Sequence, residues 1–346
     1  NSSSSLVRLD YDHIYKILRK PDSGGIQLNE DQQRGVITCL QNRVTVITGG
    51  PGTGKTTLLK KLLEVLEPYK VKFRLAAPTG RAAKRIFEST RRNAETLHRL
   101  LEFSPNIMGF GRNEDNALEL DMLIVDESSM IDVFLMHSIL RALPFKAHLV
   151  FLGDVDQLPS VGPGNILHDL IASESAEVVR LTEIFRQAQD SMIIVNAHKV
   201  NNGEFPSSGE PGSKKDFRFI KQQDPEEVFP LLREIYQKRL PAAGIPAKES
   251  IVLTPMNRGV AGTQRLNQEL QSILNKNNDE TKQVSRLGYV YKVSDRVMQI
   301  RNNYDKFVFN GDIGTILDIR MQDKKVMVDF GDRTLEYDFT ELDELT

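Results

Sequence analysis

One glycine-rich segment limits the folds open to this chain more than any other feature. Residues 49–56 read GGPGTGKT and fit the pattern G-x-x-x-x-G-K-[ST] without a mismatch. The β-branched run Val44–Thr48 precedes the segment, and leucines at helical spacing follow it from Leu58 to Leu66. Strand, loop and helix in this order predict a phosphate-binding loop, whereas a Gly/Pro turn that merely joins a strand to a helix is the alternative.

Each residue type in this segment has a physical reason. Small residues let backbone N–H groups curl around phosphate oxygens at the positive end of the following helix. Lys55 is expected to reach the β- and γ-phosphates, Thr56 to place its hydroxyl on Mg²⁺, and Thr57 to close the first helical turn. The ATP-binding residues predicted here are Gly49, Gly50, Pro51, Gly52, Thr53, Gly54, Lys55, Thr56 and Thr57.

Composition bounds the class of protein. The chain has 346 residues, of which 40% are hydrophobic and 27% charged, enough for two or three globular domains. A net charge of −2 excludes a strongly basic whole-protein surface, so any nucleic-acid site must be local. Cys39 is the only cysteine, which excludes an internal disulfide. Because no apolar stretch has spanning length, we expect a cytoplasmic protein that does not contact a membrane.

Strand and helix patterns alternate through the first half of the chain and predict a parallel α/β sheet. The predicted strands after the first are Lys72–Ala77, Asp121–Glu127, Ala147–Asp154 and Glu177–Leu181. The second half continues the alternation at 217–220 (strand), 225–239 (helix), 251–254 (strand) and 263–274 (helix). From Leu287 onward, short runs with two-residue periodicity and Gly-Asp turns predict a small β-barrel.

These changes of pattern suggest four regions. Residues 1–25 are expected to be the tail of a preceding region, and 26–185 a first α/β domain with a small insertion at about 102–120. Residues 186–286 would begin a second α/β domain, and 287–346 would form the barrel.

Two acids end the apolar strand that follows the phosphate loop. Carboxyl ends of parallel strands meet at one sheet edge, so Asp126 is expected to complete the Mg²⁺ shell of Thr56. Glu127 would orient or deprotonate the attacking water. An exposed acid pair at a strand end is the structural alternative.

With these motifs in place, the chain resembles superfamily 1 helicases of the RecD-like, 5′-to-3′ class from about Ile26 to its end. The matching segments, beyond the phosphate loop and the acid pair, are Asn29–Gln32, Ala77–Ala83, Thr96–Leu100, Gly153–Val161, Leu181–Gln187, Val252–Gly259, Val297–Tyr304 and Asn310–Gly314. The resemblance implies an α/β P-loop NTPase with tandem RecA-like parallel-sheet domains, the second incomplete, and a Src-homology-3-like barrel.

The resemblance also implies site residues. Gln32 would contact the adenine, Gln157 the γ-phosphate, and Arg186 would add positive charge to the transferring phosphoryl group, so that the predicted catalytic residues are Lys55, Glu127, Gln157 and Arg186. Residues that would line the single-strand channel are Pro78, Thr79, Arg81, Thr96, His98, Thr254, Pro255 and Asn257. A half-buried structural role for His98 and a solvated loop at 102–120, in place of a duplex-splitting pin, remain open alternatives.

The same family carries two later motifs, V and VI, the second with an arginine finger, and neither occurs before Thr346. We therefore expect a truncated piece of a longer protein, or one whose remainder is not included. The leading hypothesis is a helicase that uses ATP and Mg²⁺ on single-stranded DNA and duplex junctions in repair or recombination. The alternatives are a non-translocating ATP-binding subunit of a nuclease–helicase complex and a nucleotide-switched DNA-binding scaffold.

Overall fold

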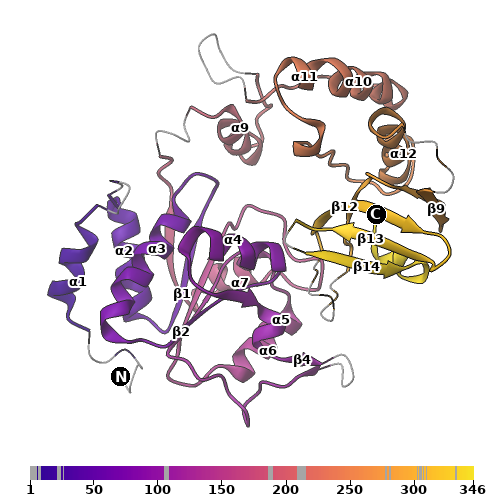
Figure 1. Cartoon of the computed structure of the whole chain (residues 1–346). Coiled ribbons are helices and arrows are strands. Elements are labelled where there is room, and N and C mark those ends of the chain that lie inside the picture. Colours follow the sequence, from indigo (N-terminus) through magenta and orange to yellow (C-terminus); the bar gives the residue numbers. More distant parts are fainter. Residues whose placement is uncertain are drawn as a thin grey trace. The chain divides into compact units, whose positions relative to one another are not determined.

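The chain forms two compact units, Asn1–Phe219 and Ile220–Thr346, which are described separately below (Figure 1). The computed structural model describes residues 6, 9–21, 25, 27–104, 109–185, 190–208, 216–276, 279, 282–301, 303, 306, 308, 310–331 and 333–346.

A six-stranded parallel sheet of order β3-β2-β6-β7-β1-β8 organises the first unit. Its strands are β1 (Val44–Gly49), β2 (Phe73–Ala77), β3 (Ala94–Thr96), β6 (Met122–Val125), β7 (His148–Gly153) and β8 (Glu177–Leu181). β1 lies between β7 and β8, with Val46 opposite Phe151 on one side and Val178 on the other. The predicted parallel α/β P-loop fold is confirmed.

Helices cover both faces of this sheet (Figure 1). They are α1 (Tyr11–Leu18), α2 (Glu30–Gln41), α3 (Lys55–Leu66), α4 (Gly80–Thr90), α5 (Leu97–Leu100), α6 (Val133–Ala142) and α7 (Ile166–Ala172), with short 3₁₀ turns η1 (Glu67–Tyr69) and η2 (Ser128–Met130); α9 (Met192–Asn201) follows the sheet. Successive strand residues face opposite sides, so Ile47 packs in the core with α1 to α4 and Val46 in the core with α5 to α7. The strands are therefore apolar throughout, as a sheet buried on both faces requires.

The predicted insertion contains a short antiparallel hairpin of β4 (Phe103–Ser104) and β5 (Gly109–Phe110). Its tip, residues 105–108, lies outside the described residues. The hairpin is consistent in position with the pin, whose use at a duplex junction stays a prediction.

The second unit begins with helices. They are η3 (Pro225–Glu227), α10 (Val228–Glu234), the π-turn η4 (Ile235–Arg239), α11 (Leu240–Ala242), η5 (Ala247–Glu249) and α12 (Thr263–Leu274). Both predicted helices are present. The strands predicted at 217–220 and 251–254 are absent, and Leu253 is 85% exposed. An extended segment becomes a strand only when its N–H and C=O groups pair with a neighbour, and the described residues supply none here.

Strands make up the rest of the second unit. A hairpin joins β9 (Gln283–Arg286) to β10 (Tyr289–Lys292), and its two-residue turn has positive φ at both Leu287 and Gly288. A four-stranded antiparallel sheet follows, of β11 (Arg296–Met298), β12 (Ile313–Arg320), β13 (Lys325–Asp329) and β14 (Thr334–Asp338), with the 3₁₀ turn η7 (Phe339–Glu344) after it. The β runs predicted from Leu287 onward are confirmed as strands.

One half-buried carboxylate joins α12 to this β structure. Asp295 accepts hydrogen bonds from the side-chain amides of Asn275 (2.7 Å) and Gln271 (2.6 Å) and from the backbone N–H of Lys292 (2.7 Å). Burial raises the pKa of Asp295, against the lowering effect of these donors. The polar contacts thus join the helical and β parts of this unit.

Candidate nucleotide site

The phosphate loop connects β1 to α3 through backbone that only glycine adopts readily. Gly54, which caps α3, has φ of 81°, and Gly52 has φ of 79°. A Cβ atom on Gly54 would also lie 2.3 Å from the amide nitrogen of Gln32. The loop is closed internally by Thr53, whose buried hydroxyl donates to the Gly50 carbonyl (2.8 Å).

Lys55 lies among the carboxylates that the sequence placed at the sheet edge. Its ammonium donates to the backbone carbonyls of Gly49 and Gly50. Burial lowers the pKa of Lys55, and the negative charges of Asp154, Asp126 and Glu127 act in the opposite direction. A cation at a glycine-rich loop, acted on by three negative charges, is the electrostatic setting expected for a bound polyphosphate and its metal.

The acid pair stands directly after β6. The Asp126 N–H donates to the Ala76 carbonyl (3.0 Å), and the Asp126 carboxylate accepts from the Glu127 N–H (2.9 Å). Glu127 has φ of 53°, an unusual conformation for a non-glycine residue that turns the chain sharply at the strand end. Burial raises the pKa of both carboxyls, and for Glu127 the neighbouring Asp126 charge adds to this effect.

The residues present fit a magnesium ion. Within the described part of the chain, no three His, Cys, Asp or Glu side chains form a metal-binding group. Mg²⁺ usually keeps several waters and takes one or two protein carboxylates plus substrate phosphates, so Asp126 and the Thr56 hydroxyl are a suitable donor set.

Gln32 is buried rather than on the surface. Its amide nitrogen donates to the Gly54 carbonyl (3.2 Å), and its amide oxygen accepts from the Asn29 N–H (3.1 Å). The Asn29 side chain in turn accepts from the Gln32 N–H (2.8 Å), which completes a reciprocal cap at the start of α2. The glutamine therefore braces the phosphate loop against α2, and its adenine contact stays a prediction.

Sequence reasoning did not single out Asp154. It is 4% exposed, follows β7 directly, and is one of the charges acting on Lys55. The sequence signal was an acidic residue directly after an apolar strand, which is also the context that identified Asp126. Gln157, a few residues later, has an exposed side chain while its N–H donates to the Asp154 carbonyl (3.2 Å). Arg186 lies outside the described residues.

The predicted DNA-contacting residues divide between the two units, and their binding role stays a prediction. In the first unit Thr79 and Thr96 cap helices α4 and α5 by accepting from backbone N–H groups, and Thr96 is buried. Pro78 is half-buried and Arg81 exposed. In the second unit the Thr254 hydroxyl donates to the Ala261 carbonyl (2.7 Å), whereas Pro255 and Asn257 are exposed.

His98 packs inside an aromatic cluster at the base of the β4–β5 hairpin. Its ring centroid lies 5.5 Å from that of Phe103 and 5.6 Å from that of Phe110. Burial lowers the pKa of His98, so the ring is neutral at pH 7. This geometry favours the structural interpretation of His98 over a charged contact with DNA.

Replacing His98 with phenylalanine should therefore leave the salt dependence of single-stranded DNA binding unchanged at pH 7. Each ion pair with a phosphate contributes about 0.7 to the slope of log K against log salt for a single strand. The slope is measured by fluorescence anisotropy of a labelled oligonucleotide, with Arg81→Ala as the comparison because Arg81 is exposed and charged. A lower slope in His98→Phe alone would contradict the neutral, structural role.

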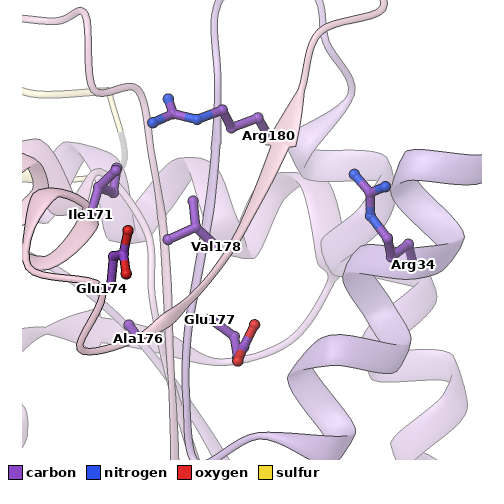
Figure 2. Close-up of a pocket in the computed structure, with 7 residues that line it drawn as sticks. All are labelled: Arg34, Ile171, Glu174, Ala176, Glu177, Val178 and Arg180. Carbon is purple, nitrogen blue, oxygen red and sulfur yellow. The ribbon is translucent and has the colours of Figure 1, made fainter.

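A separate surface pocket lies at the outer strand β8. Figure 2 shows its lining residues, which come from α2, from α7, from the turn between α7 and β8, and from β8 itself. They are Arg34, Ile171, Glu174, Ala176, Glu177, Val178 and Arg180. Arg34 is already paired with Asp31 (2.8 Å), and none of the predicted nucleotide or DNA residues lines the pocket. It does not belong to the nucleotide site.

Two family models match the chain, one in each unit. Residues 32–163 match an AAA domain, and residues 266–330 match the SH3 domain of ATP-dependent RecD-like DNA helicases. In the described residues, no helix is long and apolar enough to span a membrane.

Curated relatives cover most of this chain. The ATP-dependent RecD2 DNA helicase of Deinococcus radiodurans is 34% identical over 319 residues, which is 91% of this chain and 41% of that protein. The RecBCD enzyme subunit RecD of Mycobacterium tuberculosis strain H37Rv is 29% identical over 325 residues, which is 83% of this chain and 55% of that protein. The chain thus spans between two fifths and somewhat over half of these relatives.

A solved structure of two coordinating Pif1 helicases at forked double-stranded DNA shares the fold. It has a TM-score of 0.51 and 21% identity, and covers 90% of this chain and 76% of that one.

Proposed function

Since the chain is RecD-like in sequence and an α/β P-loop protein in fold, we propose that it is the motor portion of an ATP-dependent DNA helicase. ATP hydrolysis would drive movement along single-stranded DNA in the 5′-to-3′ direction and unwinding at duplex junctions, in DNA repair or recombination. The observation that supports the proposal is that the Lys55 ammonium contacts the Gly49 and Gly50 carbonyls of the phosphate loop, within reach of the charges of Asp126, Glu127 and Asp154.

The chemistry follows from that placement. The loop amides and Lys55 hold the β- and γ-phosphates, which requires Lys55 to exchange its carbonyl partners for phosphate oxygens. Mg²⁺ held by Thr56 and Asp126 supplies charge neutralisation for the phosphates. Glu127 accepts the proton of the attacking water, a task suited to a carboxylate whose pKa is raised by burial toward neutral pH. Gln157 and Arg186 complete the site as γ-phosphate contact and stabilising cation.

The coupling to DNA would begin within the first unit. Thr79 caps the helix that follows β2, the strand whose Ala76 carbonyl anchors Asp126. A shift at the acid pair would therefore reach the DNA-contacting end of α4 through one strand. Backbone and hydroxyl contacts to phosphates do not read bases, so little sequence preference is expected.

ATP hydrolysis by this polypeptide should rise when single-stranded DNA is added, and Lys55→Ala should abolish it. The loss of the ammonium removes the charge that holds the terminal phosphates, and the hydrogen bonds that it makes in the structure are to the backbone carbonyls of Gly49 and Gly50. Phosphate release is measured with and without an oligonucleotide. Turnover in Lys55→Ala equal to that of the unmodified chain would overturn the nucleotide site.

The relative from M. tuberculosis supplies a second candidate, because that protein is a subunit of the RecBCD enzyme. In this version the chain binds ATP within a nuclease–helicase complex whose other subunits translocate. Strand displacement by the full-length protein separates the two: unwinding of a 5′-tailed duplex, but not of a 3′-tailed duplex, supports the 5′-to-3′ motor, and hydrolysis without unwinding supports the subunit.

A further inference from the structure

A second polar side chain lies against the phosphate loop, on an element outside the sheet. His198 is on α9, and a Cβ atom built on Gly50 would lie 2.9 Å from its Cε1 and 3.5 Å from its Nε2. Gly50 is the second residue of the loop, and its carbonyl is one of the two that Lys55 contacts. The imidazole therefore packs directly on the loop, where a residue with a side chain would collide with it.

The Nε2 atom of His198 is buried and has no hydrogen-bond partner among the described residues. Leaving a buried polar group without a partner opposes folding, and such groups in native structures usually mark a contact made by something else.

The chain just before α9 also holds the loop. The Phe185 N–H donates to the Gly52 carbonyl (3.3 Å), and its ring would lie 2.5 Å from a Cβ on Gly54. Asn29 on α2 donates to the Glu183 carboxylate (2.7 Å). Phe185 thus contacts the loop at Gly52 and Gly54, and His198 contacts it at Gly50.

We infer that His198 is a phosphate-contacting residue of the nucleotide site, donating from Nε2 to an oxygen of the bound triphosphate. The inference rests on the proposed function, since it needs a triphosphate in the loop. Through this contact, occupancy of the loop would fix the position of α9. The occupant is an anion with acceptor oxygens, because the site already gathers N–H donors and the Lys55 ammonium.

The test is binding of a fluorescent ATP analogue to the full-length protein and its variants. His198→Phe keeps an aromatic ring on Gly50 but lacks the donor, and should bind about 10- to 100-fold more weakly with unchanged thermal unfolding in the absence of nucleotide. His198→Gln restores an N–H donor and should recover most of the affinity. If His198→Phe does not fold, His198→Leu takes its place.

Lys55→Ala separates this inference from the function on which it rests. Weak binding by Lys55→Ala together with normal binding by His198→Phe would overturn the role of His198 and leave the nucleotide site standing. Normal binding by both would overturn the nucleotide site itself. Equal weakening in His198→Phe and His198→Gln would also overturn the inference, because it would show that ring packing rather than the donor matters.

Discussion

Replacing Glu127 with glutamine is expected to slow ATP hydrolysis by about 10²- to 10⁴-fold and to leave ATP binding intact. Glutamine has the size of glutamate but cannot accept the proton of the attacking water. The sharp backbone turn at this position, and the hydrogen bond that its N–H donates to the Asp126 carboxylate, involve only the main chain of residue 127, so the substitution preserves them. Steady-state hydrolysis and equilibrium binding of an ATP analogue are measured on the same preparation.

The matched control is Glu183→Gln, which neutralises a carboxylate near the loop that contacts Asn29 rather than Lys55. It should retain most of the activity. Hydrolysis by Glu127→Gln at the rate of this control would contradict the assignment of Glu127 as the proton acceptor and would favour the scaffold interpretation, in which hydrolysis is incidental.

The same carboxylate predicts a pH dependence. Glu127 must be ionised to accept a proton. Burial, and to a smaller extent the negative charge of Asp126, raises the pKa of Glu127. Hydrolysis should therefore increase with pH over a range that lies above the pKa of an ordinary glutamate. Arg85 lies 3.7 Å from Glu127 and lowers this pKa. Arg85→Ala should therefore move the acid limb of the pH–rate profile to higher pH. A shift to lower pH would contradict the electrostatic assignment.

Phe151→Ala should destabilise the first unit by about 3–5 kcal/mol. Phe151 is 1% exposed on β7, the strand next to β1, and its removal leaves a cavity in the core beneath α5 to α7. Such a loss is a large part of the stability of an ordinary domain. Amide hydrogen exchange of the sheet measures the effect locally, which avoids assuming that the two units unfold together.

Phe205→Ala is the control for this prediction. Phe205 belongs to the same unit and is also replaced by alanine, but its side chain is 87% exposed. Its substitution should alter exchange in the sheet by less than about 0.5 kcal/mol. Similar losses in both variants would show that the β7 core does not govern the stability of the sheet.

The sequence was most informative where local pattern and tertiary environment agree. A β-branched run before a glycine-rich loop led to β1, and the apolar run Glu177–Leu181 was predicted with its observed ends. The cap at Asn29 was also readable, because capping depends on residues a few positions apart.

Features that depend on residues far apart in the chain could not be predicted from the sequence. The extended segments 217–220 and 251–254 have strand-like composition. Whether such a segment forms a strand depends on a second segment that pairs with it, and local composition does not reveal that partner. Burial of Gln32 and the packing of His198 on Gly50 join residues far apart in the sequence. Thr96 matched a DNA-binding pattern, and its observed cap uses the same hydroxyl for a local purpose.

The strand order has a consequence for synthesis. β1 is translated first among the sheet strands, but its two neighbours, β7 and β8, are translated last. Pairing of Val46 with Phe151 and Val178 must wait for more than a hundred residues, or about 5 to 25 s on the ribosome. During this interval the apolar strand leading into the phosphate loop has no sheet to join. The nascent chain therefore depends on protection from aggregation until residue 181 has emerged.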